Sequence, residues 1–362
     1  MYFVIPGDLE TRTGGYGYDR RIISGLRERG WLVELKRLDD SFPAPTPSAR
    51  AQAVHVLAAI PDRSTVLIDG LALGALPAEA EHEAARLRIV ALVHHPLAAE
   101  TGLDPALAAT LAISERRALA AARAVVVTSR ATANRLADYG VSAERITVVE
   151  PGTDPAPVGR GSQSAISNLK SAISLLCVAT LTPRKGHELL FRALASIPQR
   201  NWRLTCAGSL DRDPATVERL RAQLRADTLD DRVTFAGDMD EATLATYYDR
   251  ADLFVLPTLY EGYGMAVAEA LARGLPVIST ATGAIGELVA GRVRRQPGQP
   301  GQPAGIVVAP GDSAAFSEAL ARVVGDPDLR ARFAAGARDV RDRLPTWRDA
   351  AAAMALALQA QA

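Results

Sequence analysis

The chain has 362 residues, of which 48% are hydrophobic and 23% charged, a composition typical of globular proteins and not of disordered ones. This length exceeds that of one ordinary domain and predicts two. Lysine plus arginine equals aspartate plus glutamate at 41 each, so the formal net charge is zero and nucleic acid is not favoured as a partner.

The N-terminal residues predict a strand instead of a leader peptide. Residues 2–5 form a short apolar run followed by Pro6 and Gly7, without a basic region or a long apolar core. No apolar run reaches the ~20 residues that a membrane helix needs. Cys177 and Cys206 each lie in an apolar run and are expected to be buried strand thiols. We therefore expect a soluble, cytoplasmic protein, which leaves peripheral contact with a membrane surface open.

Short apolar runs alternate with longer helical patterns through the first half of the chain. A helix is expected at 105–122, where alanine, arginine and glutamate are frequent. Buried parallel strands are expected at 66–69, 89–93, 124–128 and 146–149. The alternation predicts a doubly wound α/β domain over residues 1–155.

The same alternation returns after a stretch rich in proline, glycine and serine, which predicts a linker at 156–172. A second α/β domain is expected over 173–345, and an alanine-rich helix follows from about Trp347. Within it, residues 292–303 predict a surface loop whose arginines are expected to be solvated, with phosphate binding as the alternative. Its expected strands are 175–179, 203–207, 233–236, 253–256, 276–279 and 305–308. The predicted fold is therefore two Rossmann-like domains facing across a cleft, the usual place for a ligand.

The first candidate binding segment is 13–19, between the first strand and a helix expected at 20–29. Gly14 and Gly15 would let backbone N–H groups approach a phosphate at a helix N-terminus. A dinucleotide fingerprint would need a glycine where Arg20 stands, which weakens an NAD-binding interpretation. A tight turn without a ligand is the structural alternative.

Two histidines, His94 and His95, follow the strand expected at 89–93. Polar side chains at the carboxyl end of a parallel strand point into the ligand crevice, and neighbouring residues alternate in direction. No further ligands are apparent beside them, so no metal site is predicted. The alternative is a satisfied, partly buried histidine.

Two further strand ends carry charged residues. Arg184 and Lys185, a flexible cation, precede a helix expected at 188–195 and suit a diphosphate; a solvated loop is the alternative. Glu261 and Glu269 lie eight residues apart, which is just over two helical turns, so a helix starting near Gly264 would place them on nearly one face. Carboxylates accept hydrogen bonds from sugar hydroxyls.

Taken together, these motifs resemble the retaining glycosyltransferases of family 4. The resemblance rests on the two glutamates with seven residues between them, on the preceding Pro-Thr-Leu-Tyr and on the following Ala-Leu-Ala-Arg-Gly-Leu-Pro-Val. The Thr-Pro-Arg-Lys-Gly segment, His94 and Gly15 fall in the expected order. The resemblance covers nearly the whole chain and is strongest over 175–325. It implies the GT-B fold, with the donor held by 173–345, the acceptor by 1–155, and a helix at 346–362 crossing back to the first domain.

The resemblance also implies roles for single residues. Lys185 and Arg184 would hold the donor diphosphate, and Glu269 the ribose hydroxyls. Many family members carry an arginine where this chain has Thr180, so diphosphate binding would depend more on the other two cations. Contacts to the transferred sugar are expected from Glu261, from the backbone amides of Gly262, Tyr263 and Gly264, and from His94 near the reacting carbon, while the Gly15 N–H would approach the diphosphate. The catalytic residues are thus expected to be His94, Lys185 and Glu261.

The expected reaction retains the configuration of the sugar, follows a front-face route, and needs neither a metal ion nor a cofactor. A UDP- or GDP-sugar is the expected donor, and the sequence defines neither the acceptor nor the oligomeric state. One alternative is a non-catalytic protein that binds nucleotide sugars, from which donor hydrolysis without acceptor would distinguish a transferase. The other is a different enzyme on the same fold, such as a nucleotide-sugar epimerase, against which the two glutamates argue.

Overall fold

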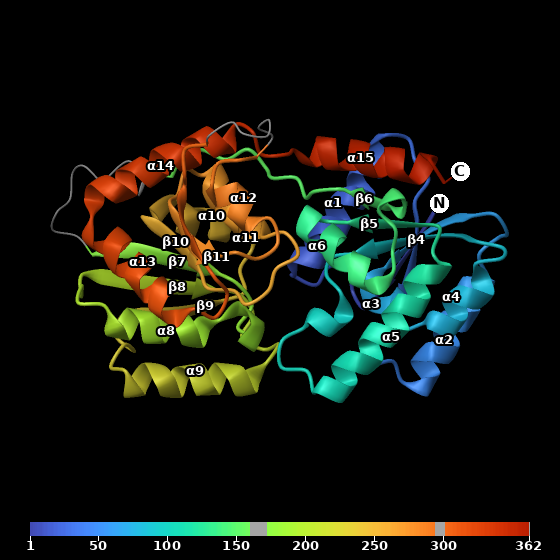
Figure 1. The fold of residues 1–362 in the computed structure, drawn as a ribbon, viewed down its shortest axis with the longest axis horizontal. Helices are drawn as coiled ribbons and strands as arrows, with labels where there is room; N and C mark the ends of the chain where they lie inside the picture. Colours follow the sequence, from blue (N-terminus) through green and yellow to red (C-terminus); the bar gives the residue numbers. More distant parts are fainter. Residues whose placement is uncertain (160–171, 294–300, 362) are drawn as a thin grey trace. The chain divides into compact units, whose positions relative to one another are not determined.

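A computed structural model describes residues 1–159, 172–293 and 301–361, which form two compact units (Figure 1). Unit 1 comprises Met1–Gly152 and Pro345–Ala362, and unit 2 comprises Thr153–Leu344. Most of the predicted linker, and residues 294–300 of the predicted loop with Arg294 and Arg295, lie outside the described residues.

Unit 1 is built on a six-stranded parallel sheet in the order β2-β1-β3-β4-β5-β6. The strands are β1 (Tyr2–Pro6), β2 (Glu34–Leu38), β3 (Thr65–Asp69), β4 (Arg88–Val93), β5 (Ala124–Val127) and β6 (Ile146–Val148). The helices are α1 (Gly14–Glu28), α2 (Pro47–Ala58), α3 (Gly70–Leu73), α4 (Pro77–Glu83), η1 (Leu97–Ala99), α5 (Pro105–Ala121), α6 (Arg130–Arg135), η2 (Leu136–Tyr139), η3 (Ala143–Arg145) and α15 (Trp347–Gln359).

The predicted strands of this unit are present because their apolar runs are covered on both faces. β3, β4 and β5 are buried almost throughout, as interior parallel strands require. β2 was not predicted: its sequence, ELKRL, is mostly charged and it pairs with β1 at one edge of the sheet, where exposed side chains are tolerated.

Helix α15 belongs to unit 1 although unit 2 precedes it in the chain. It packs along α1, with which it shares a contact surface in unit 1 (Figure 1). The small and apolar side chains of Ala351, Met354 and Leu358 are buried there, and the Arg21 guanidinium lies 5.6 Å from the Trp347 ring centroid. Thr346 and Asp349 form a reciprocal capping box that defines where α15 begins.

Unit 2 contains a second six-stranded parallel sheet, in the order β12-β11-β10-β7-β8-β9. The strands are β7 (Ile173–Val178), β8 (Trp202–Ala207), β9 (Val233–Gly237), β10 (Leu253–Leu256), β11 (Val277–Thr280) and β12 (Gly305–Val308). The helices are η4 (Pro183–Lys185), α8 (His187–Ser196), α9 (Pro214–Ala226), α10 (Glu241–Arg250), α11 (Met265–Ala272), α12 (Ile285–Val289), α13 (Ser313–Gly325) and α14 (Pro327–Arg341).

The sheet of unit 2 is covered by helices on both faces. α8 packs against α9 and α13, and α11 packs against α14 (Figure 1). Cys177 on β7 and Cys206 on β8 are register partners, both fully buried and both free, as expected for strand thiols. Both units are therefore doubly wound, Rossmann-like α/β structures, which confirms the predicted fold class.

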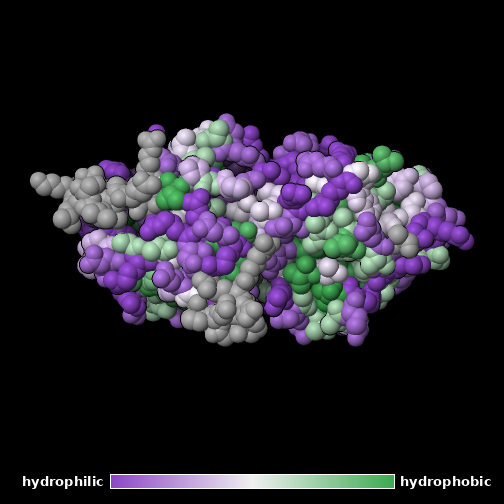
Figure 2. Space-filling view, turned by 90° about the horizontal axis from the view of Figure 1, so that it is seen from above, coloured by the Kyte–Doolittle hydropathy of each residue, from purple (hydrophilic) through white to green (hydrophobic). Residues whose placement is uncertain are grey.

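The surface shows no extended apolar belt on the face drawn in Figure 2, where hydrophilic side chains surround smaller hydrophobic areas. Within the described residues, no helix combines the length and the apolar character needed to cross a membrane.

Candidate functional site

The strand order of unit 2 locates its ligand crevice. From β7 the chain proceeds to β8 on one side, whereas β10 lies on the other side of β7 and continues to β11. In doubly wound sheets, ligands bind beyond the carboxyl ends of the strands at such a switch point. The loops after β7 and β10 carry Lys185 and Glu261 respectively, so the topology brings together two residues predicted from separate motifs.

Gly186 allows these two loops to pack against each other. Its φ of 71° lies in the left-handed region, and a Cβ added there would lie 2.1 Å from the carbonyl oxygen of Pro257. Directly after it, α8 begins at His187 without a side-chain cap. The first-turn N–H groups of a helix carry a partial positive charge, so Lys185 stands beside a second source of positive potential.

Glu261 and two cations form an ion cluster, Arg184–Glu261–Lys185. The Lys185 Nζ lies 2.5 Å from Glu261 Oε1, and Arg184 Nη1 lies 3.9 Å from Oε2. Burial would raise the pKa of Glu261, but the two cations hold it below its usual value. Lys185, which was expected to be a flexible cation, is instead paired with Glu261, and its side chain is 16% exposed.

The loop that carries Glu261 is held by backbone contacts. Arg184 donates from Nη1 to the Tyr260 carbonyl at 2.9 Å, and the Leu259 N–H donates to the Arg184 carbonyl at 2.7 Å. The buried Thr258 donates from Oγ1 to the Tyr260 carbonyl at 3.0 Å. Thr258 belongs to the Pro-Thr-Leu-Tyr motif quoted for the family resemblance, but its role in holding the loop was not predicted from the sequence.

The following residues complete the predicted sugar-binding segment. Gly262 is half-buried, Tyr263 is buried, and Gly264, with φ 106°, leads into α11 at Met265. Glu261 thus precedes the helix. The helical-face argument for Glu261 and Glu269 is wrong, because only Glu269 has helical periodicity.

Glu269, on α11, is held by residues that sequence reasoning missed. The buried Tyr248 of α10 donates its hydroxyl to Glu269 Oε2 at 3.0 Å, and the Arg273 guanidinium lies 4.5 Å from the Tyr248 ring centroid. Burial raises the pKa of Glu269, opposed by the tyrosine hydroxyl and by Arg273. The carboxylate is therefore fixed in orientation and half-buried.

The crevice of unit 1 follows from the same topology. Here β1 leads to β2 on one side and has β3 on the other, so the loops after β1 and β3 flank the switch point, and the loop after β4 lies next to them. α1 begins at Gly14, not near residue 20 as expected, because Thr13 caps it by accepting from the Tyr16 N–H. Gly15 consequently lies in the first turn of the helix, where N–H groups lack an intrahelical acceptor.

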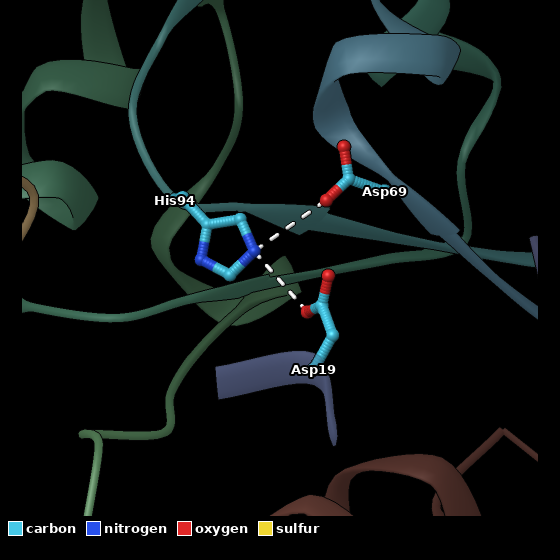
Figure 3. A group of neighbouring side chains, drawn as sticks. All are labelled: Asp19, Asp69 and His94. Atoms are coloured by element: carbon cyan, nitrogen blue, oxygen red, sulfur yellow. Dashed lines mark ion pairs between the residues drawn. The ribbon is translucent and has the colours of Figure 1, made fainter. Parts of the chain in front are cut away.

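His94 lies against two buried carboxylates (Figure 3). Its Nε2 is 3.2 Å from Asp19 Oδ1 and 3.5 Å from Asp69 Oδ2. Asp19 comes from α1 and is 0% exposed, whereas Asp69 ends β3 and is 2% exposed. A Cβ added at Gly15 would lie 3.6 Å from His94 Cδ2, so the predicted glycine and histidine are brought together. His95 faces another partner, with Nε2 3.6 Å from Glu100 Oε2.

The carboxylates decide the charge of His94. Burial lowers the pKa of an imidazole, but Asp19 and Asp69 outweigh burial and raise the pKa of His94 to about 10. For the carboxyl group of Asp19, burial has the opposite effect and raises the pKa. Asp69 ends a predicted strand and Asp19 ends the candidate segment 13–19, but neither was predicted as a partner of His94.

Asp19, Asp69 and His94 also place three potential ligand atoms within 4.8 Å of one another. Asp19 and Asp69, which are distant from His94 in sequence, therefore supply potential ligand atoms that the residues adjacent to His94 do not. The contacts of 3.2 and 3.5 Å are those of a direct ion pair between an imidazolium and two carboxylates. The absence of a metal site stays a prediction.

Comparisons with known proteins identify the family of the chain. The family described as "Glycosyl transferases group 1" matches residues 162–340, and "Glycosyltransferase Family 4" matches residues 25–157. Among curated relatives, a D-inositol 3-phosphate glycosyltransferase from Xylanimonas cellulosilytica is 32% identical over 67% of this chain and 58% of its own length. A second, from Salinispora arenicola, is 30% identical over 62% of this chain and 52% of its own.

Solved structures share the fold at low sequence identity. Sucrose-phosphate synthase from Thermosynechococcus elongatus has a TM-score of 0.79 at 21% identity and covers 98% of both chains. Anabaena HepE, solved in complex with UDP and glucose, has a TM-score of 0.75 at 17% identity, covering 99% of this chain and 100% of its own. The match spans just over half the length of these curated relatives. With two Rossmann-like units of the GT-B fold and both sequence families matched, the chain belongs to family 4 of the glycosyltransferases.

Proposed function

We propose that the protein transfers a sugar from a nucleoside diphosphate sugar to an acceptor hydroxyl, with retention of configuration at the anomeric carbon. The observation that carries this proposal is the Arg184–Glu261–Lys185 cluster beside the start of α8, at the switch point of unit 2. Two cations and a helix N-terminus suit a diphosphate. HepE binds UDP, so uridine is the first base to test.

The donor would be bound mainly by unit 2. Lys185 and Arg184 would contact the diphosphate, and Glu269, oriented by Tyr248, would accept hydrogen bonds from the ribose hydroxyls. Glu261, with the amides of residues 262–264, would hold the transferred sugar. Unit 1 would contribute the Gly15 N–H to the diphosphate, and His94 to the sugar near its reacting carbon.

A front-face route agrees with the state of Glu261. The bond from the anomeric carbon to the diphosphate oxygen breaks, and the acceptor oxygen bonds to that carbon from the same face while its proton passes to a phosphate oxygen. A double-displacement route would need a free carboxylate as nucleophile. Glu261 is instead engaged by Lys185 at 2.5 Å, which favours a binding role.

The proposal includes transfer without a metal ion. The leaving diphosphate needs positive charge close to it, which a metal ion would otherwise supply. Lys185, Arg184 and the first turn of α8 would supply it from the protein.

A donor panel tests the proposal. Thermal unfolding would be followed with UDP- and GDP-sugars, since a ligand that binds the native state raises the midpoint by mass action. The stabilising donor would then be incubated with EDTA and with water as the only acceptor, and the anomeric configuration of the released sugar read by NMR before it mutarotates. We expect slow, EDTA-resistant release of nucleoside diphosphate and an initial α-anomer of the sugar from an α-linked donor. Stabilisation without any turnover would indicate a binding protein, and an inverted product would contradict the front-face route.

A further inference from the structure

The cluster of His94 with Asp19 and Asp69 contains more negative charge than one histidine requires. One imidazolium is matched by two carboxylates, and both carboxylates are buried. Buried carboxylates are costly unless a partner compensates them. Neither oxygen of Asp19 has a hydrogen bond of regular geometry within the described part of the chain, so its charge contact with His94 is its main compensation there.

Asp19 is placed to act on His94 and not on a substrate. It is 0% exposed, whereas the His94 side chain is 19% exposed. Both carboxylates face Nε2, and Nδ1 lies on the far side of the ring (Figure 3). Asp69 is fixed in turn, because its Oδ1 accepts from the Leu71 N–H at 2.8 Å.

The remaining neighbours hold the ring without competing for its charge. The Tyr18 ring meets the imidazole edge-on at 5.3 Å between centroids, and its hydroxyl donates to the Val149 carbonyl. Thr128 donates from Oγ1 to the His94 carbonyl at 3.3 Å. A further charged side chain that acts on Asp19, besides His94 and Asp69, is Arg20, which lowers the pKa of Asp19 while donating to the Leu9 and Thr11 carbonyls.

We propose that Asp19, assisted by Asp69, is a positioning residue that holds the His94 imidazole as a cation with Nδ1–H turned away from both carboxylates. His94 then acts as a fixed hydrogen-bond donor to the transferred sugar and not as a base. The three charges sum to one negative charge, so the cluster does not oppose the positive charge that develops on the anomeric carbon. The role in turnover depends on the proposed function, but the ionisation state of His94 does not.

Nuclear magnetic resonance of the imidazole nitrogens of the full chain tests the ionisation state directly. The protein has five histidines, and His94→Gln identifies the His94 signal by its loss. In the unmodified protein we expect an imidazolium up to about pH 9, because two carboxylates within 4 Å favour the charged form. Asp19→Asn keeps the shape of the side chain and should lower the His94 pKa by about 1–3 units.

Glu83→Gln is the matched control. Glu83 is also a buried carboxylate of unit 1 that pairs with a cation, Arg86, at 2.6 Å. Its replacement should leave the His94 signal where it was. A general loss of packing would move the His94 signal in both variants. If Asp19 holds the His94 imidazole as proposed, the signal moves only in Asp19→Asn.

Turnover supplies the second readout. In Asp19→Asn, kcat should fall as pH rises from about 6 to 9, by about twofold if the His94 pKa drops from about 10 by one unit and by about 100-fold if it drops by three, while the donor KM changes by less than about threefold. The unmodified protein should show no such loss over this range. A His94 that is neutral at about pH 7.5, or a His94 pKa unchanged by Asp19→Asn, would overturn the proposal. So would one tightly bound metal ion per chain, detected by mass spectrometry and lost in Asp19→Asn. If no donor is turned over but the His94 imidazolium is found, the proposed function fails, whereas the inference that Asp19 keeps His94 charged is supported.

Discussion

The charged clusters of the two units have opposite arrangements. In unit 1 a cation, His94, lies between two carboxylates, whereas in unit 2 a carboxylate, Glu261, lies between two cations. Both clusters occupy the switch point of a doubly wound sheet. Equivalent positions in two similar folds therefore carry an excess of charge of opposite sign.

The difference in burial shows which charges are available to a ligand. Lys185 and Arg184 keep 16% and 19% of their side chains exposed, so cationic groups reach the crevice of unit 2. In unit 1 the carboxylates are buried and the histidine is the exposed member. Unit 2 thus presents positive charge suited to a diphosphate. Unit 1 presents a hydrogen-bond donor, His94, whose charge is balanced by the buried Asp19 and Asp69.

Lys185→Ala should cause the largest change and tests the positive excess of unit 2. We expect a loss of kcat of ~10²–10³-fold, because a stabiliser of the leaving diphosphate is removed. Arg192→Ala, an exposed cation on α8 paired with Glu188, is the control and should have little effect. Steady-state kinetics would measure both variants. Turnover by Lys185→Ala within about threefold of the unmodified protein would show that Lys185 does not act on the diphosphate.

His94→Ala is the corresponding change in unit 1. We expect kcat to fall by roughly 10²-fold, as for other donors to a transition state. His95→Ala should cost far less, because His95 faces Glu100 and not the buried carboxylates. If His95→Ala proves the more damaging variant in the same assay, the assignment of His94 to the reacting sugar is wrong.

Glu269→Ala tests whether unit 2 also binds the donor away from the reacting bond. We expect the donor KM to rise by roughly tenfold with a smaller change in kcat, because ribose contacts are similar in ground and transition states. Tyr248→Phe removes only the hydroxyl that orients Glu269 and should raise KM by about two- to tenfold. A collapse of kcat at unchanged KM would contradict the ribose role.

Glu115→Gln should have the smallest effect on turnover and tests the burial of carboxylates in unit 1. Burial raises the pKa of Glu115 to about 8, opposed by the Leu97 N–H that donates to it. An acid with a raised pKa contributes stability that is present below its unfolded pKa of about 4 and lost as pH rises through the folded value. Unfolding measured at about pH 5 and pH 9 should show a loss of stability in the unmodified protein that is smaller in Glu115→Gln. Equal losses would show that Glu115 is not the titrating group.

The fold followed from the sequence wherever burial imposes a simple pattern. Interior strands such as β4 are continuous apolar runs, whereas the charged edge strand β2 lacks that pattern and was missed. The Lys185 and Glu261 motifs were recognised separately, but their contact depends on β7 lying next to β10, which no local pattern encodes.

The partners of the predicted site residues were the hardest features to predict from the sequence. Asp19 lies in the candidate segment 13–19, but its contact with His94 exists only because α1 follows β1 at the switch point, next to the strands that carry Asp69 and His94. Tyr248 likewise meets Glu269 through the packing of α10 near α11. Such contacts arise from tertiary structure, which no local sequence pattern encodes.

The position of α15 has a consequence for biosynthesis. A ribosome completes the β-strands of unit 1 first, then synthesises the whole of unit 2, and only afterwards produces the helix that covers α1. During that interval the surface of α1 that receives Ala351, Met354 and Leu358 has no α15 to cover it. The nascent first unit is therefore expected to expose this surface until synthesis has passed Trp347, and its final packing depends on a helix that follows unit 2 in the chain.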